Sequence, residues 1–307
     1  MKNQKQKIII ITGPTSVGKT ALSVRLAKEL DGEIISADSI QVYRGFDIGS
    51  AKVTKEEMEG VPHHLIDIMD PNIEYSAGDF AEQAKVKIQE ISEKGKIPII
   101  VGGTGLYITA LLFPFDSDCK RDEVYRKDLE EIAEKYGKRK LYEMLLEVDK
   151  ESTKNIHENQ QDRIIRALEI YHQTGKKKSE LERDLKSSVY DYLLIVLDRD
   201  RSEVYNCIES RVDKMIESGL IEEVKALLDG GISPTAPAMK GIGYKEMLMF
   251  LLGEETKEKA IELLKQHTRN YAKRQLTFFK KINGANFVNY KDYEKIYSMI
   301  KDFLRED

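Results

Sequence analysis

The stretch KIIIITGPTSVGKT, residues 7–20, decides the fold that we expect for this chain. Residues 8–11 form a continuous isoleucine run, which is typical of a short strand buried on both faces. The residues after it match the pattern G-x-x-x-x-G-K-[ST], at Gly13, Gly18, Lys19 and Thr20. An amphipathic run, 21–30, follows and predicts a helix. Strand, glycine loop and helix in this order predict a phosphate-binding loop.

The chemistry of a phosphate explains this spacing. Glycines allow the backbone to curl so that its N–H groups point at phosphate oxygens. Lys19 adds a positive point charge, and the Thr20 hydroxyl can ligate Mg²⁺. The N-terminus of the next helix would lie under the anion. The loop therefore indicates a bound diphosphate or triphosphate, and it leaves open which molecule carries the phosphates.

The composition limits the classes of protein to which the chain can belong. Of its 307 residues, 41% are hydrophobic and 33% are charged, which is typical of a globular protein. The net charge of −4 argues against bulk nucleic-acid binding, so any RNA contact needs a local basic patch. Two cysteines are too few for a disulfide scaffold or a four-cysteine zinc site. No apolar run approaches the roughly 20 residues of a membrane helix, and we expect a cytoplasmic, monomeric protein without a membrane segment.

Strand and helix patterns alternate along the chain. Short apolar runs predict strands at 32–37, 63–68, 98–101 and 193–197, and an edge strand at 287–290. Helical spacing is found at 75–93, 209–228 and 257–281. This alternation predicts an α/β fold, namely a P-loop NTPase-like parallel sheet with helices on both faces.

The stretch 117–190 interrupts this pattern because it contains no strand-like run. Leucines and isoleucines recur there at helical spacing among charges of both signs. We therefore predict an inserted all-helical domain at 117–190. The core domain would consist of 1–116 and 191–307.

Polar residues follow several of the predicted strands. In a parallel sheet the carboxyl ends of the strands meet at one edge, where ligands bind. Asp38 follows the second strand, where it can bind Mg²⁺ or accept a proton; the alternative is a capping aspartate. Arg201 follows the strand at 193–197 and can reach phosphate oxygens, or it lies on the surface. A kinase often has an acidic residue after the strand at 98–101, but Gly102 stands there.

One stretch near the C-terminus is strongly basic. KQHTRNYAKRQLTFFKK, residues 265–281, carries basic side chains and no acid. Arg269 and Lys273 lie near one face of the predicted helix, and Arg274 is adjacent. This suggests a polyanionic partner, although a solvated helix face is equally compatible with the pattern.

Six motifs together resemble the tRNA dimethylallyltransferase family, also called tRNA isopentenylpyrophosphate transferases. They are GPTSVGKT at 13–20, SADSIQVYR at 36–44, GGTGLY at 102–107, NQQDRIIRALE at 159–169, MKGIGYKE at 239–246 and TRNYAKRQLTFF at 268–279. The resemblance covers nearly the whole chain and implies a reaction. N6 of the adenosine 3′ of a tRNA anticodon would attack C1 of dimethylallyl diphosphate, and diphosphate would leave.

The resemblance also implies roles for residues. Asp38 would be the general base, acting with Lys19, Thr20 and Arg201 as the catalytic set, and Thr20 would hold Mg²⁺. The diphosphate would be bound by Gly13, Pro14, Thr15, Ser16, Val17, Gly18, Lys19, Thr20 and Arg201. The tRNA would be contacted by Asp38, Ser39, Ile40, Gln41, Thr104, Arg126, Asp162, Arg163, Ile164, Ile165, Arg166, Lys240, Gly241, Ile242, Gly243, Tyr244, Lys245, Arg269, Lys273 and Arg274. The insertion would grip the anticodon stem-loop.

Two other functions fit parts of the sequence. A P-loop nucleotide or metabolite kinase would use the insertion as a lid bearing Arg163 and Arg166. A nucleotide-gated RNA-binding module would use the same loop and basic stretch without chemistry at Asp38. The three hypotheses differ in whether a phosphoryl group, a prenyl group or nothing is transferred.

Overall fold

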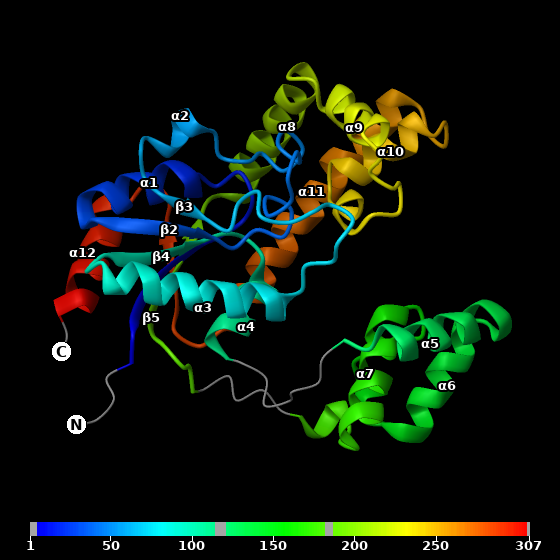
Figure 1. Ribbon diagram of the computed structural model, residues 1–307. Helices are drawn as coiled ribbons and strands as arrows, with labels where there is room; N and C mark the ends of the chain where they lie inside the picture. Colours follow the sequence, from blue (N-terminus) through cyan, green and yellow to red (C-terminus); the bar gives the residue numbers. More distant parts are fainter. Residues whose placement is uncertain (1–4, 114–120, 182–186, 306–307) are drawn as a thin grey trace. The chain divides into compact units, whose positions relative to one another are not determined.

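The computed structural model describes residues 5–113, 121–181 and 187–305. The chain divides into two compact units. We call Met1–Leu112 with Ser188–Asp307 the core unit, and Phe113–Ser187 the helical unit. Figure 1 shows the helices of the helical unit in green. Among the described residues, no helix combines the length and apolar character that a bilayer span requires.

The predicted insertion begins and ends a few residues later than the helical unit. Its predicted first residue, 117, lies outside the described residues. At the other end, 188–190 belongs to the core unit because the Val189 N–H donates to the Leu112 carbonyl (3.1 Å). The Lys5 ammonium also donates to the Ser188 carbonyl (2.6 Å). Hydrogen bonds to the core, which a hydropathy pattern does not reveal, determine this boundary.

The core unit contains a six-stranded sheet in which every pairing is parallel. The strand order is β3-β2-β4-β1-β5-β6. The strands are β1 (Lys7–Thr12), β2 (Gly32–Ser36), β3 (His63–His64), β4 (Ile97–Val101), β5 (Asp191–Asp198) and β6 (Ala285–Asn289). The isoleucine run is therefore a strand at the centre of the sheet, between β4 and β5. The predicted α/β class is confirmed.

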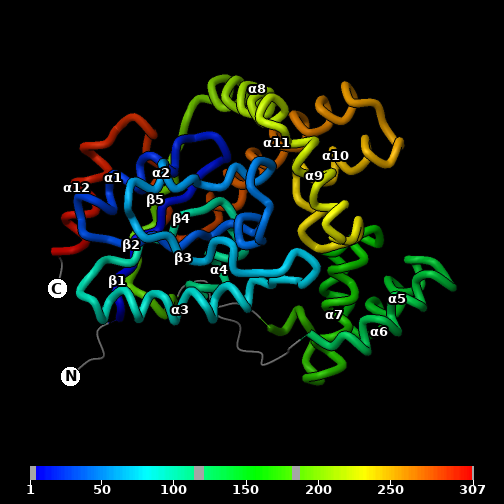
Figure 2. The backbone as a smooth tube through the Cα atoms, turned by 45° about the horizontal axis from the view of Figure 1, so that its top comes forward, coloured from blue at the N-terminus to red at the C-terminus, as the bar shows by residue number. Residues whose placement is uncertain are grey.

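Helices cover both faces of the sheet (Figures 1 and 2). Ile9 and Ile11 face a core formed with α1 and α12, whereas Ile8 and Ile10 are buried on the opposite face. The helix α3 packs against β2 and β4. The core-unit helices are α1 (Lys19–Leu30), α2 (Lys55–Met58), α3 (Ala77–Glu93), α4 (Gly105–Leu112), α8 (Arg201–Glu217), α9 (Leu220–Asp229), α10 (Tyr244–Leu251), α11 (Lys257–Phe279) and α12 (Tyr293–Arg305).

Two predicted elements differ from the structure. The strand expected at 63–68 is only His63–His64, because Leu65 and Asp67 take positive φ angles of 62° and 54° and turn the chain. The single helix expected at 209–228 is two helices, α8 and α9, separated at Gly219 (φ 95°). In addition, α8 already begins at Arg201, because Asp200 caps it by accepting from the N–H groups of Ser202 and Glu203.

The helical unit consists of α5 (Glu123–Tyr136), α6 (Lys138–Val148) and α7 (Gln161–Thr174) with short 3₁₀ turns at Ser152–Lys154 and Lys178–Glu180. Its apolar core includes Leu129, Leu141 and Ile164. A predicted all-helical insertion is thus observed as an independently packed unit. Beside this core lies Glu169, whose side chain is fully buried.

Glu169 is held by hydrogen bonds from three groups. Arg126 donates to both of its carboxylate oxygens (2.8 and 3.0 Å), the Asp122 N–H donates to one (2.7 Å), and Arg166 donates to the other. Burial raises the pKa of Glu169, but these hydrogen bonds outweigh it and hold the pKa at about 2. Glu169 thus stays ionised inside the unit, and it links α7 to the start of α5.

We expect Arg126→Ala to destabilise the helical unit by about 3–5 kcal/mol at neutral pH, because it removes a partner of a buried carboxylate. A group with a lowered pKa stabilises the fold above its unfolded pKa and loses this effect as pH falls towards its folded pKa. The difference from wild type should therefore shrink between pH 5 and about 2. Hydrogen exchange in α5 and α7 measures opening of this unit.

Arg139→Ala is the matched control, because Arg139 forms an exposed pair with Glu143 on α6. Such a pair contributes at most about 0.5 kcal/mol. Equal effects of the two substitutions, or an Arg126→Ala effect that does not change with pH, would contradict the role given to Glu169.

Candidate active site

The candidate site lies at the carboxyl edge of the sheet, where four strands end. The Gly13 loop leaves β1, Asp38 follows β2, Gly102 follows β4, and Arg199 follows β5. Parallel pairing of β1 with β4 and β5, and of β2 with β4, brings these ends to one edge. The strand ends therefore converge as the sequence predicted.

The loop between β1 and α1 contains three residues with positive φ angles, as expected of a loop whose N–H groups turn towards one centre. Its φ angles are 142° at Gly13, 64° at Ser16 and 102° at Gly18. A Cβ at Gly13 would lie 2.7 Å from the Leu197 carbonyl oxygen, so only glycine fits there. Gly18, the N-cap residue of α1, forms no side-chain hydrogen bond to the first turn of the helix. The N–H groups of that turn can therefore donate to an anion.

Lys19 lies inside this loop. Its ammonium donates to the carbonyl oxygens of Gly13 (3.1 Å) and Pro14 (2.8 Å). Burial, together with the nearby positive charge of Arg211, lowers the pKa of Lys19 to about 7, and the negative charge of Asp38 opposes the shift. An incoming anion would therefore meet an amine whose charge depends on pH near neutrality.

Arg211 is a site residue that the sequence analysis did not identify. Its Nη1 lies 3.3 Å from the Thr15 hydroxyl and 3.5 Å from the Ser16 hydroxyl. Burial lowers the pKa of its guanidinium, and Asp38 opposes this. No local motif marks Arg211 in the sequence, because it stands in the middle of α8 and reaches the loop only through the packing of this helix.

Arg201, expected at the diphosphate, makes different contacts. Its Nε donates to the Tyr205 hydroxyl (3.0 Å), and its guanidinium lies over the Tyr205 ring. Ten residues of α-helix span about 15 Å, so α8 carries Arg201 and Arg211 to well-separated positions. Of these two arginines, Arg211 is the one in contact with the anion loop.

Asp38 is oriented by the backbone that follows it. Its Oδ1 accepts hydrogen bonds from the N–H groups of Ile40 (2.9 Å) and Gln41 (3.2 Å). Within the described residues, Oδ2 has no hydrogen-bond partner. The charge of Asp38 acts on Lys19 and Arg211, and, after burial, contributes to raising the pKa of Tyr271 to about 12. Asp38 is therefore close to the anion loop and presents one carboxylate oxygen.

The glycine motif after β4 packs against the protein's own chain. A Cβ at Gly102 would clash with the Ala37 backbone, and one at Gly105 would clash with the Phe278 ring. Thr104 then accepts a hydrogen bond from the Ser39 N–H (3.2 Å) and donates its own N–H to the Ala37 carbonyl (3.2 Å). Thr104 thereby holds both chain neighbours of Asp38.

The segment Lys240–Lys245 is mixed in character. Tyr244 is fully buried, with its hydroxyl donating to Glu223 (2.7 Å), and Gly243 has φ 103°. Lys240 is exposed, and Lys245 is partly exposed. Of these residues, the two lysines can offer side chains to a large ligand, while Tyr244 serves packing.

The basic helix α11 is partly neutralised within the protein. Arg269 pairs with Glu209, and Lys265 pairs with Asp213. Lys273 and Arg274 are exposed. The accessible positive charge of this stretch is thus smaller than the sequence suggested; on α11 it includes these two residues, and Lys280 and Lys281, just after the helix, are exposed as well.

In the helical unit, some of the residues predicted to contact RNA are buried or hydrogen-bonded within the protein, and others are exposed. Ile164 and Ile165 are buried in the unit's core. Arg126 and Arg166 are hydrogen-bonded to Glu169. Asp162 and Arg163 are exposed and line a cavity of about 460 Å³ with Lys138, Asn159, Gln160 and Gln161.

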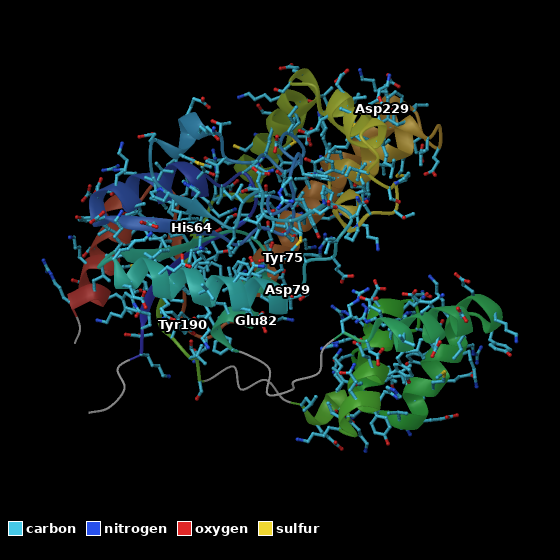
Figure 3. The ribbon with its side chains drawn as sticks, viewed as in Figure 1. His64, Tyr75, Asp79, Glu82, Tyr190 and Asp229 are labelled. Atoms are coloured by element: carbon cyan, nitrogen blue, oxygen red, sulfur yellow. The ribbon has the colours of Figure 1, made fainter. Side chains whose placement is uncertain are left out.

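A metal ion would have few protein ligands here. Among the described residues, no group of three or more His, Cys, Asp or Glu side chains is arranged to hold one. His64, labelled in Figure 3, lies instead with its Nε2 2.8 Å from Glu33. Thr20 is exposed in the first turn of α1 beside the anion loop. A single hydroxyl fits Mg²⁺ bound mainly through substrate phosphates and water.

The fold and the site define a P-loop group transferase with a carboxylate at the end of β2. The sequence pattern described as IPP transferase matches residues 41–282. This chain belongs to that family.

Curated relatives span nearly the whole chain. A tRNA dimethylallyltransferase of Bacillus cytotoxicus is 46% identical over 302 residues, covering 98% of this chain and 95% of that protein. One of Geobacillus thermodenitrificans is 47% identical over 302 residues, covering 98% and 96%. These names favour the transferase over the kinase.

Solved structures agree with the relatives. The full-length tRNA isopentenylpyrophosphate transferase of Bacillus halodurans is 45% identical, with TM-score 0.75 and coverage of 98% of both chains. A eukaryotic dimethylallyltransferase described as acting on tRNA is 32% identical, with TM-score 0.85 and coverage of 97% of this chain and 79% of that one. The resemblance of the six motifs is thereby confirmed.

Because the pKa of Lys19 is about 7, pyrophosphate binding should weaken by about tenfold per pH unit above pH 7, as the charged amine that the anion prefers is lost. In Lys19→Met, the pH dependence of binding should reflect only the titration of pyrophosphate itself. In Arg211→Gln, the weakening of binding should begin at a higher pH, because removal of a neighbouring positive charge raises the pKa of Lys19. Isothermal titration calorimetry between pH 6 and 9 measures these effects.

Arg201→Gln is the control for Arg211→Gln. We expect it to leave the pH profile of pyrophosphate binding unchanged, because its guanidinium contacts Tyr205. The opposite result, with Arg201→Gln weakening binding and Arg211→Gln having no effect, would place Arg201 at the diphosphate, as the sequence predicted.

Proposed function

We propose that this protein transfers the dimethylallyl group of dimethylallyl diphosphate to N6 of the adenosine 3′ of a tRNA anticodon. Diphosphate is the other product. The observation that carries the proposal is the pairing, at one sheet edge, of an anion loop with Asp38, whose Oδ2 is available. The names of the relatives give the transferred group and the acceptor.

Charge development explains the residues around the loop. As the C1–O bond breaks, its electron pair goes to the diphosphate, and positive charge spreads over the allyl group. Lys19, Arg211 and the N–H groups at the start of α1 stabilise the negative charge of the leaving group. The loop thus favours departure of diphosphate without any attack at phosphorus.

Asp38 acts on the nucleophile. The exocyclic amine of adenine is a weak nucleophile, and as its nitrogen bonds to C1 it must lose a proton. Asp38 Oδ2 accepts this proton, while Oδ1 remains bound to Ile40 and Gln41 N–H groups. A general base of this kind contributes about 10²–10⁴ in rate.

The RNA must present an unstacked adenosine, which costs least in a single-stranded loop such as the anticodon loop. We assign the phosphate contacts of the core unit to the exposed Lys240, Lys273 and Arg274. In the helical unit we assign them to Arg163 with Lys138, and propose that this unit grips the anticodon stem.

Mg²⁺ is the proposed cofactor. Thr20 would hold it beside the loop, and when bound it would supply further neutralisation of the diphosphate charge. We further propose that the protein acts in the cytoplasm as a monomer.

Mass spectrometry of tRNA nucleosides tests the function. After incubation of tRNA with dimethylallyl diphosphate and Mg²⁺, we expect N6-isopentenyladenosine with the wild-type protein. Asp38→Asn should lower turnover by about 10²–10⁴-fold, since the amide cannot accept the proton. Its tRNA affinity should stay near that of wild type.

Two results would contradict this assignment. Phosphoryl transfer from ATP without a prenylated nucleoside would favour the kinase. Full activity of Asp38→Asn would remove Asp38 from the chemistry.

Salt dependence tests the RNA surface. The logarithm of tRNA affinity should fall linearly with the logarithm of salt concentration, and Lys273→Gln should reduce this slope by about 0.7–0.9 if it releases one counterion. Lys295→Gln, at an exposed site on α12, should leave the slope unchanged. Filter binding at 50–300 mM salt measures both, and equal slopes for all three proteins would exclude Lys273 from the contact surface.

A further inference from the structure

Gln275 is a buried polar residue at the site for which the chemistry above has no role. It lies on α11 and is only 5% exposed. Its Oε1 accepts a hydrogen bond from the Thr15 N–H (2.9 Å), and its Nε2 donates to the Gly103 carbonyl (3.0 Å). Both ends of one carboxamide are therefore used, as a buried amide requires.

These two hydrogen bonds join the two halves of the site. Thr15 belongs to the anion loop, and Gly103 belongs to the loop that follows β4. The residue after Gly103 is Thr104, which is bonded to both Ala37 and Ser39, the neighbours of Asp38. Hydrogen bonds, joined by the peptide link between Gly103 and Thr104, thus connect the anion loop through Gln275 to the backbone that carries Asp38.

The surroundings leave Gln275 little freedom. A Cβ at Gly103 would overlap the Gln275 amide nitrogen, so the glycine exists to admit this side chain. The Tyr271 hydroxyl, one turn earlier on α11, also approaches the Gly103 carbonyl (3.5 Å). An amide that is buried and bonded at both ends holds its neighbours more firmly than an exposed one, because breaking either bond leaves an unsatisfied group.

We propose that Gln275 is a positioning residue whose carboxamide sets the spacing between the leaving diphosphate and Asp38. The inference rests on the proposed function and adds a residue to it. Prenyl transfer requires the amine, C1 and the leaving oxygen to be aligned, and a misplacement of 1 Å can cost about 10²-fold in rate. A link between the two loops is a direct way to maintain that alignment.

Gln275→Met tests the proposal, because it keeps the length of the side chain and removes both hydrogen bonds. We expect kcat for prenyl transfer to fall by about 10²-fold, with the KM for dimethylallyl diphosphate and the Kd for tRNA changing little. Gln266→Met is the matched control, since Gln266 is exposed on the same helix, and it should behave as wild type. An unchanged kcat in folded Gln275→Met would overturn the proposal.

A second variant separates positioning from support of the anion loop alone. Gln275→Glu retains an acceptor for the Thr15 N–H but faces the Gly103 carbonyl with an oxygen, so it breaks only the link to the β4 loop. We expect kcat to fall here too. A loss confined to weaker pyrophosphate binding, with kcat preserved, would show that Gln275 only supports the anion loop and would overturn the proposal.

Hydrogen–deuterium exchange gives a readout that does not depend on prenyl transfer. In the peptide spanning 13–20, the Thr15 amide should exchange faster in Gln275→Met than in wild type or Gln266→Met. Unchanged exchange would mean that Gln275 does not hold the loop. If wild type formed no prenylated adenosine while the exchange difference appeared, the proposed function would fail and the link itself would stand.

Discussion

Parallel pairing of β1 with β4 and β5 is the constraint on which this site depends. Strands that run in one direction end at one edge, so the loops that follow them must meet there. The anion loop leaves β1, and Thr104 lies just after β4. Asp38, which follows the neighbouring β2, is then held by backbone N–H groups and by Thr104 on either side of it. The pairing of the strands, more than any single motif, therefore determines which residues meet at the site.

The charges around the anion loop favour the departure of a negatively charged leaving group such as diphosphate. Burial lowers the pKa of both Lys19 and Arg211, and the charge of Arg211 lowers the pKa of Lys19 further, while the nearby charge of Asp38 opposes both shifts. Two confined cations gain more from a diphosphate than exposed ones do, because less water competes. One carboxylate close to these cations can receive a proton while they retain the leaving group. These three side chains therefore suit a reaction in which a C–O bond breaks, with positive charge developing on carbon and negative charge on the leaving oxygen.

The sequence predicted the elements whose signals are local and failed where tertiary contacts decide. The isoleucine run, the glycine loop and the basic helix were found at their observed positions. Arg211 was missed because it stands mid-helix, without a motif, and only the packing of α8 brings it to Thr15. The strand β3 was predicted too long because an apolar run does not reveal the positive φ angles at Leu65 and Asp67 that end it. Tyr244, in a recognised motif, is buried and donates its hydroxyl to Glu223.

The sequence by itself determined the class of this protein: a parallel α/β core, a helical insertion, an anion loop and membership of a tRNA-modifying family. These follow from hydrophobic periodicity and from motifs whose spacing reflects backbone geometry. Only the tertiary structure decided which side chains meet, because contacts such as Arg211 with Thr15, Gln275 with Gly103, and Glu169 with Arg126 join residues far apart in the chain. No local pattern encodes those distances, since they arise when separate helices pack against the sheet or against one another.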